Sequence, residues 1–127
     1  MTGPTITAVT KQLSQAQVNE YADAADDHNP IHSDEAFAAA SPLGGTIAHG
    51  MLVLATISEM MAASLGEAWL RGGRLKVRFK APAKTTDALT ASATALSSPD
   101  GIRYAVECRN QDGELLVSGT AQVAAGG

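Results

Sequence analysis

The chain contains 127 residues, 45% of them hydrophobic, which favours a single globular domain over residues 1–127 rather than a disordered chain. Aromatic residues make up 4%, so the core is expected to consist of Ala, Val, Leu, Ile and Met. A net charge of −4 argues against a general nucleic-acid binder. The single cysteine, Cys108, excludes an internal disulfide and favours a cytoplasmic location, and neither a signal peptide nor a membrane span is expected.

The first half of the chain predicts a short strand and two helices. Residues 5–9 are compatible with the strand. Ser14 to Gln17 match a capping box, which opens the first helix, and Pro30 is expected to end it. A second, short helix is expected over residues 34–40, with Ser33 as its N-cap. The apolar face of the first helix follows helical spacing and consists of Val18, Tyr21, Ala22 and Ala25.

A long apolar helix is expected from about residue 48 to residue 65, with Gly66 as its stop. The second half of the chain then changes to a period of two, which is typical of strands with one face in water. The alternating segments are residues 75–79, 88–96, 102–108 and 115–123. One long helix followed by an antiparallel meander predicts an α+β fold, in which the sheet wraps around the buried helix.

A carboxylate and an imidazole lie five residues apart at Asp27 and His32. A continuous helix would place these side chains about 140° apart, but Pro30 prevents such a helix and allows a loop to bring them together. Such a pair can take a proton from water and return one to carbon. The alternative is that Asp27 caps a turn and His32 is an ordinary polar residue.

His49 and Gly50 stand at the start of the long helix. Helix N-termini carry unpaired N–H groups and a partial positive charge, and glycine lets a ligand approach the backbone closely. The Gly50 N–H is therefore a candidate donor to the oxygen of a thioester as it becomes an enolate. Alternatively, Gly50 only permits close packing. The imidazole of His49 has two open roles, because it can orient the loop instead of reacting.

The string Asp-His-Asn-Pro-Ile-His-Ser-Asp, followed by Ala-His-Gly-Met, resembles the motifs of the MaoC-like family of (R)-specific enoyl-CoA hydratases and 3-hydroxyacyl dehydratases. The resemblance continues through Val-Arg-Phe-Lys-Ala-Pro to the last strand, and it implies a hotdog fold. The chain departs from the family at residues 85–87, where Thr-Thr-Asp replaces the frequent Pro-Gly-Asp. The resemblance assigns catalysis to Asp27, His32 and Gly50, and we expect Asn29, His49 and Ser58 to contribute to substrate binding.

The activity implied by the resemblance is reversible hydration of trans-2-enoyl-CoA to the (R)-3-hydroxyacyl thioester, with no metal and no cofactor besides the coenzyme A of the substrate. Three alternatives remain: a 3-hydroxyacyl-carrier-protein dehydratase, a hotdog thioesterase and a non-catalytic acyl-thioester-binding subunit. The expected partners are the acyl thioester, on coenzyme A or acyl carrier protein, and a second copy of the chain, as a homodimer or higher homo-oligomer. Neither nucleic acid nor membrane is expected as a partner. Six of the nine basic residues lie between Arg71 and Lys84. They form either the solvent-exposed face of a strand or a binding site for the phosphates of coenzyme A.

Overall fold

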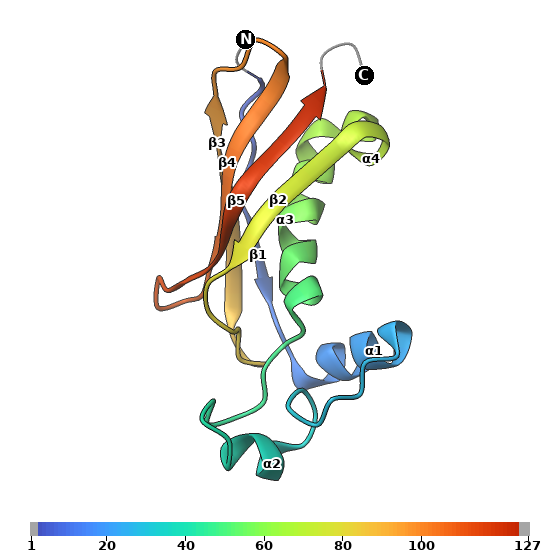
Figure 1. Ribbon diagram of the computed structural model, residues 1–127, viewed down its shortest axis with the longest axis vertical. Helices are drawn as coiled ribbons and strands as arrows, with labels where there is room; N and C mark the ends of the chain where they lie inside the picture. The colour runs from blue at the N-terminus through green and yellow to red at the C-terminus, as the bar shows by residue number, and fades with distance from the viewer. Residues whose placement is uncertain (1–2, 125–127) are drawn as a thin grey trace.

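The computed structural model describes residues 3–124 and is built on one five-stranded antiparallel sheet. Along the sheet the strands are ordered β1-β3-β4-β5-β2. Helix α3 (Gly50–Leu65) lies along one face of this sheet and contacts β1, β3 and β4 (Figure 1). The α+β class predicted from the sequence is therefore confirmed. The strands are β1 (Val9–Gln12), β2 (Gly73–Phe79), β3 (Ala88–Leu96), β4 (Gly101–Arg109) and β5 (Leu115–Ala124).

The long helix forms because its apolar residues recur on one side at helical spacing. The predicted helix is confirmed, and it begins at Gly50, two residues later than expected. Gly66 ends it with a positive φ of 59°, a conformation that favours glycine. The buried residues of the helix face the sheet and supply much of the core: Leu52, Val53, Thr56, Ile57, Met60 and Met61.

The sheet contributes the other half of the core through the alternation of its strands. On β4, Tyr104, Val106 and Cys108 are buried, whereas the alternate residues Arg103 and Ala105 are exposed. Tyr104 is fully buried, and its hydroxyl donates a hydrogen bond of 2.6 Å to the carbonyl of Pro4. A core poor in aromatic residues is thus completed by small and branched side chains, as the composition predicts.

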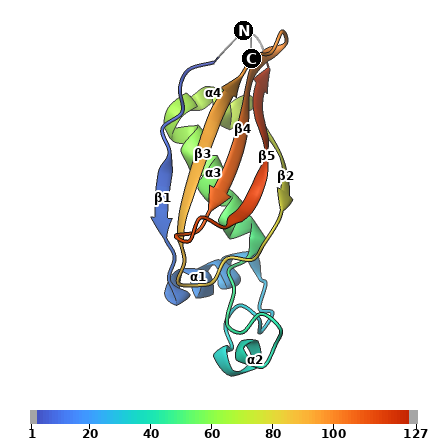
Figure 2. The same cartoon turned by 90° about the vertical axis from the view of Figure 1, so that its left-hand side faces the viewer.

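The strand order corrects one expectation. Strands β3, β4 and β5 form the meander, but β2 pairs with β5 and lies at an edge, with β1 at the other edge (Figure 2). The segment from Lys80 to Asp87 crosses from β2 to β3, and it is held under the start of α3 by hydrogen bonds from Ala48 N to Ala83 O (2.8 Å) and from Thr85 N to Thr46 O (3.3 Å). This segment, residues 80–87, forms one wall of the candidate site described below.

Two local boundaries also differ from the expectation. The first strand lies at Val9–Gln12 and not at residues 5–9, because its backbone pairs with β3 from Val9 onward. Helix α1 (Gln15–Ala25) ends five residues before Pro30, and its C-cap residue Asp26 has a left-handed φ of 52°. Aspartate tolerates that conformation better than most residues.

Helix α2 (Glu35–Ala39) is capped by Asp34 and not by Ser33: the Asp34 carboxylate accepts from Phe37 N at 3.1 Å. The Ser14 cap of α1 is confirmed, since its hydroxyl accepts from Gln17 N at 3.2 Å. A further helix, α4 (Glu67–Gly72), was not expected. Within residues 3–124, none of the helices combines the length and apolar character needed to cross a bilayer.

Candidate active site

Three segments that are distant in the sequence meet at the N-terminus of α3. The loop of residues 26–34, between α1 and α2, carries Asp27 and His32. The segment before α3 lies beside this loop, with a hydrogen bond of 3.1 Å from Ile47 N to Ile31 O, and beside the crossing segment, where Ile47 bridges to Lys84. This arrangement places His49 and Gly50 next to the Asp27 loop.

The imidazole of His32 is held in one orientation by a hydrogen bond to the backbone of a neighbouring segment. Its Nδ1 lies 2.8 Å from the carbonyl oxygen of Ile47. Because a carbonyl can only accept, Nδ1 carries the proton of the neutral ring and Nε2 is left with a lone pair. Gln15 also donates from Nε2 to the backbone carbonyl of His32 at 2.8 Å. His32 is thus presented as a proton acceptor at Nε2.

His49 is buried next to His32 and Asp27, with 3% of its surface exposed. Its ring stacks on that of His32, with centroids 3.7 Å apart and an interplanar angle of 24°, and it lies tilted against Tyr21 with centroids 4.8 Å apart. Its Nε2 donates to the backbone carbonyl of Asp27 at 3.1 Å. No partner for its Nδ1 is found among the described residues.

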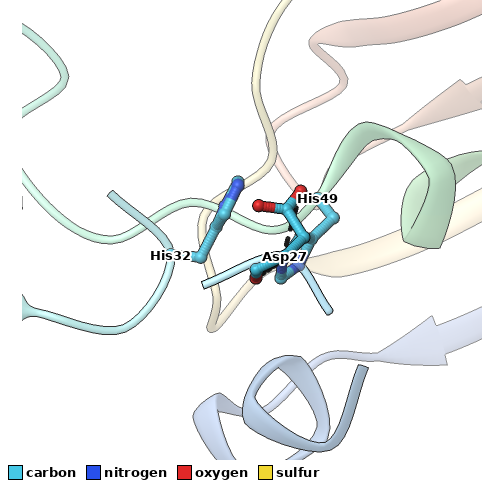
Figure 3. Close-up of side chains that lie close together, drawn as sticks. All are labelled: Asp27, His32 and His49. Carbon is cyan, nitrogen blue, oxygen red and sulfur yellow. Dashed lines mark hydrogen bonds and ion pairs between the residues drawn. The ribbon is translucent and has the colours of Figure 1, made fainter. Parts of the chain in front are cut away.

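The carboxylate of Asp27 lies beside both imidazoles (Figure 3). One atom from each of Asp27, His32 and His49 lies within 4.8 Å of the others. The carboxylate is half exposed, its Oδ2 is 3.9 Å from Nε2 of His49, and its Oδ1 accepts from Asn29 N at 3.4 Å. The loop therefore brings Asp27 and His32 together, as the position of Pro30 in the sequence predicts.

The two other residues assigned to substrate binding have different surroundings. The side-chain oxygen of Asn29 accepts from Ile31 N at 3.1 Å, which stiffens the loop between Asp27 and His32. Ser58 accepts a hydrogen bond of 3.1 Å from Nε1 of Trp69. Because Ser58 lies eight residues beyond Gly50, the two are about 12 Å apart along the helix axis. The structure does not bring Ser58 to this cluster.

An apolar cavity of about 350 Å³ opens beside the cluster. His32 and Gly50 both line it, whereas His49 does not. Gly50 is the first residue of α3, and its N–H has no acceptor among the described residues. The cavity thus combines a proton acceptor, a free backbone donor and an apolar wall. The other lining residues are Ile47, Ala48, Val53, Phe79, Lys80, Ala81, Pro82, Ala83 and Val117.

Asp27, His32 and His49 are also residue types that bind metals. An imidazole binds a metal through a lone pair in the plane of its ring. The rings of His32 and His49 are stacked 3.7 Å apart, so an ion about 2.1 Å from a nitrogen of each would lie far outside both ring planes. Binding one ion through both histidines would therefore require the rings to unstack.

Comparison with known proteins identifies the family. A family model described as "MaoC like domain" matches residues 2–112. The (R)-specific enoyl-CoA hydratase of Aeromonas caviae is 33% identical over 119 residues, which cover 91% of this chain and 88% of the hydratase. The 3-hydroxyacyl-thioester dehydratase Z of Mycobacterium tuberculosis is 36% identical over 92 residues, which cover 69% of this chain but 61% of the dehydratase.

Solved structures agree with these relatives. The (R)-hydratase from A. caviae involved in PHA biosynthesis superimposes with a TM-score of 0.81 at 29% identity, covering 98% of this chain and 96% of that one. The R-hydratase PhaJ1 from Pseudomonas aeruginosa also gives a TM-score of 0.81, at 30% identity, covering 97% of this chain and 82% of that one. The chain belongs to the MaoC-like hydratase and dehydratase family and has the hotdog fold.

Proposed function

We propose that this protein reversibly adds water to trans-2-enoyl thioesters to give (R)-3-hydroxyacyl thioesters. The observation that carries the proposal is the shared cavity: His32, with its Nε2 lone pair, and Gly50, with its free N–H, line the same apolar space. The carboxylate of Asp27 does not itself line that space, but it is half exposed and lies beside His32, which does. The (R) configuration is supported by similarity to the Aeromonas caviae hydratase.

The distances suit a water molecule shared by Asp27 and His32. Two hydrogen bonds of about 2.8 Å that meet at a tetrahedral angle span about 4.6 Å, and the polar atoms of Asp27, His32 and His49 all lie within 4.8 Å of one another. As the water oxygen bonds to C3, His32 Nε2 takes a proton and the C2–C3 π electrons move toward the thioester oxygen. Gly50 N–H donates to this oxygen, and the protonated His32 returns its proton to C2, which completes the addition.

This chemistry needs no electron transfer and no Lewis acid, because the Asp27–His32 pair can activate the water and Gly50 can stabilise the enolate. We therefore propose that the protein uses no metal and no cofactor apart from the thioester carrier. The reverse reaction, dehydration of a 3-hydroxyacyl thioester, uses the same groups. The similarity to dehydratase Z supports it as the second candidate direction.

Coenzyme A is the proposed carrier. Arg74, Lys76 and Arg78 project from the exposed face of β2, and none of them forms an ion pair within the described residues. Lys80, the next basic residue along the chain, lines the cavity. A cationic row that leads toward the cavity suits the phosphates of coenzyme A. If so, KM for an enoyl-CoA should rise with ionic strength more than KM for an enoyl thioester of pantetheine.

We also propose that the protein is at least a homodimer. The two edge strands, β1 and β2, leave backbone groups open to pairing. Several large apolar side chains are exposed, including Met51 (58%) at the start of α3 and Leu70 (75%) in α4. Burial of these groups against a second copy would remove them from water. Light scattering at micromolar concentration should report a mass of twice 13.0 kDa or more.

The deciding experiment is hydration of crotonyl-CoA, followed as loss of the enoyl absorbance with a parallel assay for free thiol. The parental protein should form (R)-3-hydroxybutyryl-CoA, identified by chiral analysis, with little free coenzyme A. Asp27→Asn and His32→Ala should each lower the rate about 10²–10⁴-fold, the usual contribution of general acid–base catalysis. A folded variant of either kind that hydrates at the parental rate would disprove the assignment.

A further inference from the structure

We infer that His49 is a positioning residue: it holds Asp27 and His32 in place and takes no part in proton transfer. This inference rests on the proposed hydration. The side chain of His49 is buried, lies between the rings of Tyr21 and His32, and does not line the cavity. An acyl thioester in the cavity would therefore not touch it. Its effect on catalysis has to pass through the residues that it contacts.

The first contact fixes the backbone of Asp27. The loop of residues 26–34 has little core of its own, since Ile31 and His32 are half-buried and its other residues are exposed. Asp27 N–H donates to Ala22 O at 2.9 Å, so its N-terminal side is tied to the end of α1. Its carbonyl accepts from His49 Nε2 at 3.1 Å. His49 therefore fixes the carbonyl side of Asp27 and leaves the carboxylate free toward the cluster.

The second contact fixes the ring of His32. The hydrogen bond from Nδ1 to Ile47 O at 2.8 Å holds one edge of that ring. Stacking on His49 at 3.7 Å holds its face, so that the direction of Nε2 is set. His49 is also the N-cap residue of α3, immediately before Gly50. His49 thus contacts Asp27 and His32 through its side chain and is joined to Gly50 through its backbone.

The nitrogens of His49 distinguish positioning from simple packing. Nδ1 is buried without a partner among the described residues, which is unfavourable for stability. If the ring served only as filling between Tyr21 and His32, phenylalanine would stack equally well and would bury no unpaired nitrogen. The feature that phenylalanine cannot replace is the Nε2–H that donates to Asp27.

His49→Phe therefore separates the two roles. It keeps an aromatic ring beside His32 and removes the donor to Asp27, so we expect a melting temperature equal to or above the parental value. We expect kcat for crotonyl-CoA to fall at least tenfold and KM to stay within twofold. His49→Gln restores an N–H donor at the reach of Nε2, and its kcat should lie above that of His49→Phe. His28→Phe, at an exposed histidine of the same loop, should match the parental enzyme in both constants.

Amide hydrogen exchange gives a readout that does not depend on activity. The amides of Asp27 and His32, which donate to Ala22 O and Asn29 O, should exchange several-fold faster in His49→Phe and return toward the parental rate in His49→Gln. Unchanged exchange together with parental kcat in His49→Phe would overturn the inference. If the parental protein hydrates no enoyl thioester but its loop exchange responds as described, the proposed function fails and the positioning role stands.

Discussion

Replacing Gly50 with alanine tests whether a free approach to its N–H is required. The new methyl group would lie 3.2 Å from Cε1 of Phe79 and 3.5 Å from its Cδ1 and Cζ. Carbon atoms prefer about 3.5–4.0 Å, so the Phe79 ring has to shift by a few tenths of an ångström. The ring is 53% exposed and can move. Because alanine also restricts the unfolded chain, we expect the free energy of unfolding to change by less than about 1 kcal/mol.

Activity should respond far more than stability. The alanine N–H is still present, but the methyl group and the displaced Phe79 ring occupy the wall of the cavity against which the thioester lies in the proposed reaction. Complete loss of one oxyanion donor costs about 10²–10³ in kcat. A displaced oxyanion keeps part of this interaction, so we expect kcat/KM to fall about 10–10³-fold, which is about 1.4–4 kcal/mol of transition-state free energy.

The assay is crotonyl-CoA hydration with unfolding by urea measured in parallel, and Gly72→Ala is the matched control. Gly72 is the last residue of α4, and a methyl group there would meet nothing within 4 Å. The control should therefore retain parental kcat/KM. If Gly50→Ala is folded and also retains parental kcat/KM, the backbone-donor role of Gly50 is wrong.

Three further predictions concern metals, the thioesterase alternative and pH. Exhaustive chelation should leave hydration unchanged, because the stacked rings of His32 and His49 do not converge on one ion; activity lost on chelation and restored by zinc would contradict this. Glu59→Gln should also leave hydration unchanged, since Glu59 is paired with Lys11 at 2.8 Å and does not line the cavity, whereas thiol release that depends on Glu59 would favour a thioesterase. Burial raises the pKa of the Cys108 thiol from 9.0 to about 11. The unfolded chain then loses this proton first as pH rises, so the contribution to stability is complete below pH 9 and falls by up to about 1.4 kcal/mol per pH unit toward pH 11. Urea titrations of Cys108→Ala should lack this part of the slope, and a slope equal to the parental one would refute it.

The regular elements could be predicted because their periods are local. The alternation of basic and apolar residues in β2 and the apolar stripe of α3 require no knowledge of the rest of the chain. Helix α4 could not be found in this way, since six residues between two glycines are too few to show a helical period. The first strand was predicted at the wrong residues for another reason. Its position depends on pairing with β3, about 80 residues later in the sequence.

The strand order was beyond the reach of local patterns. An antiparallel meander is the simplest path for four consecutive strands, but β2 pairs with β5. The crossing from Lys80 to Asp87 makes this possible, because its backbone finds hydrogen-bond partners at Thr46 and Ala48. Its residues look like an ordinary loop in the sequence, and only the folded chain shows that Ala83 is buried in the cavity wall.

The same distinction between local and tertiary information explains which features of the candidate site could be predicted from the sequence. The separation of Asp27 from His32 by Pro30 implies a loop that can bring the two together, and the structure places them so. The orientation of His49 had no such signal. The sequence allows its ring to face a substrate or the interior, and the choice is made by Tyr21 and His32, which enclose it from two other segments. The neighbouring residues His49 and Gly50 thus have different proposed roles. Gly50 exposes its backbone N–H to the cavity, whereas the side chain of His49 points into the interior and holds the Asp27 loop in place.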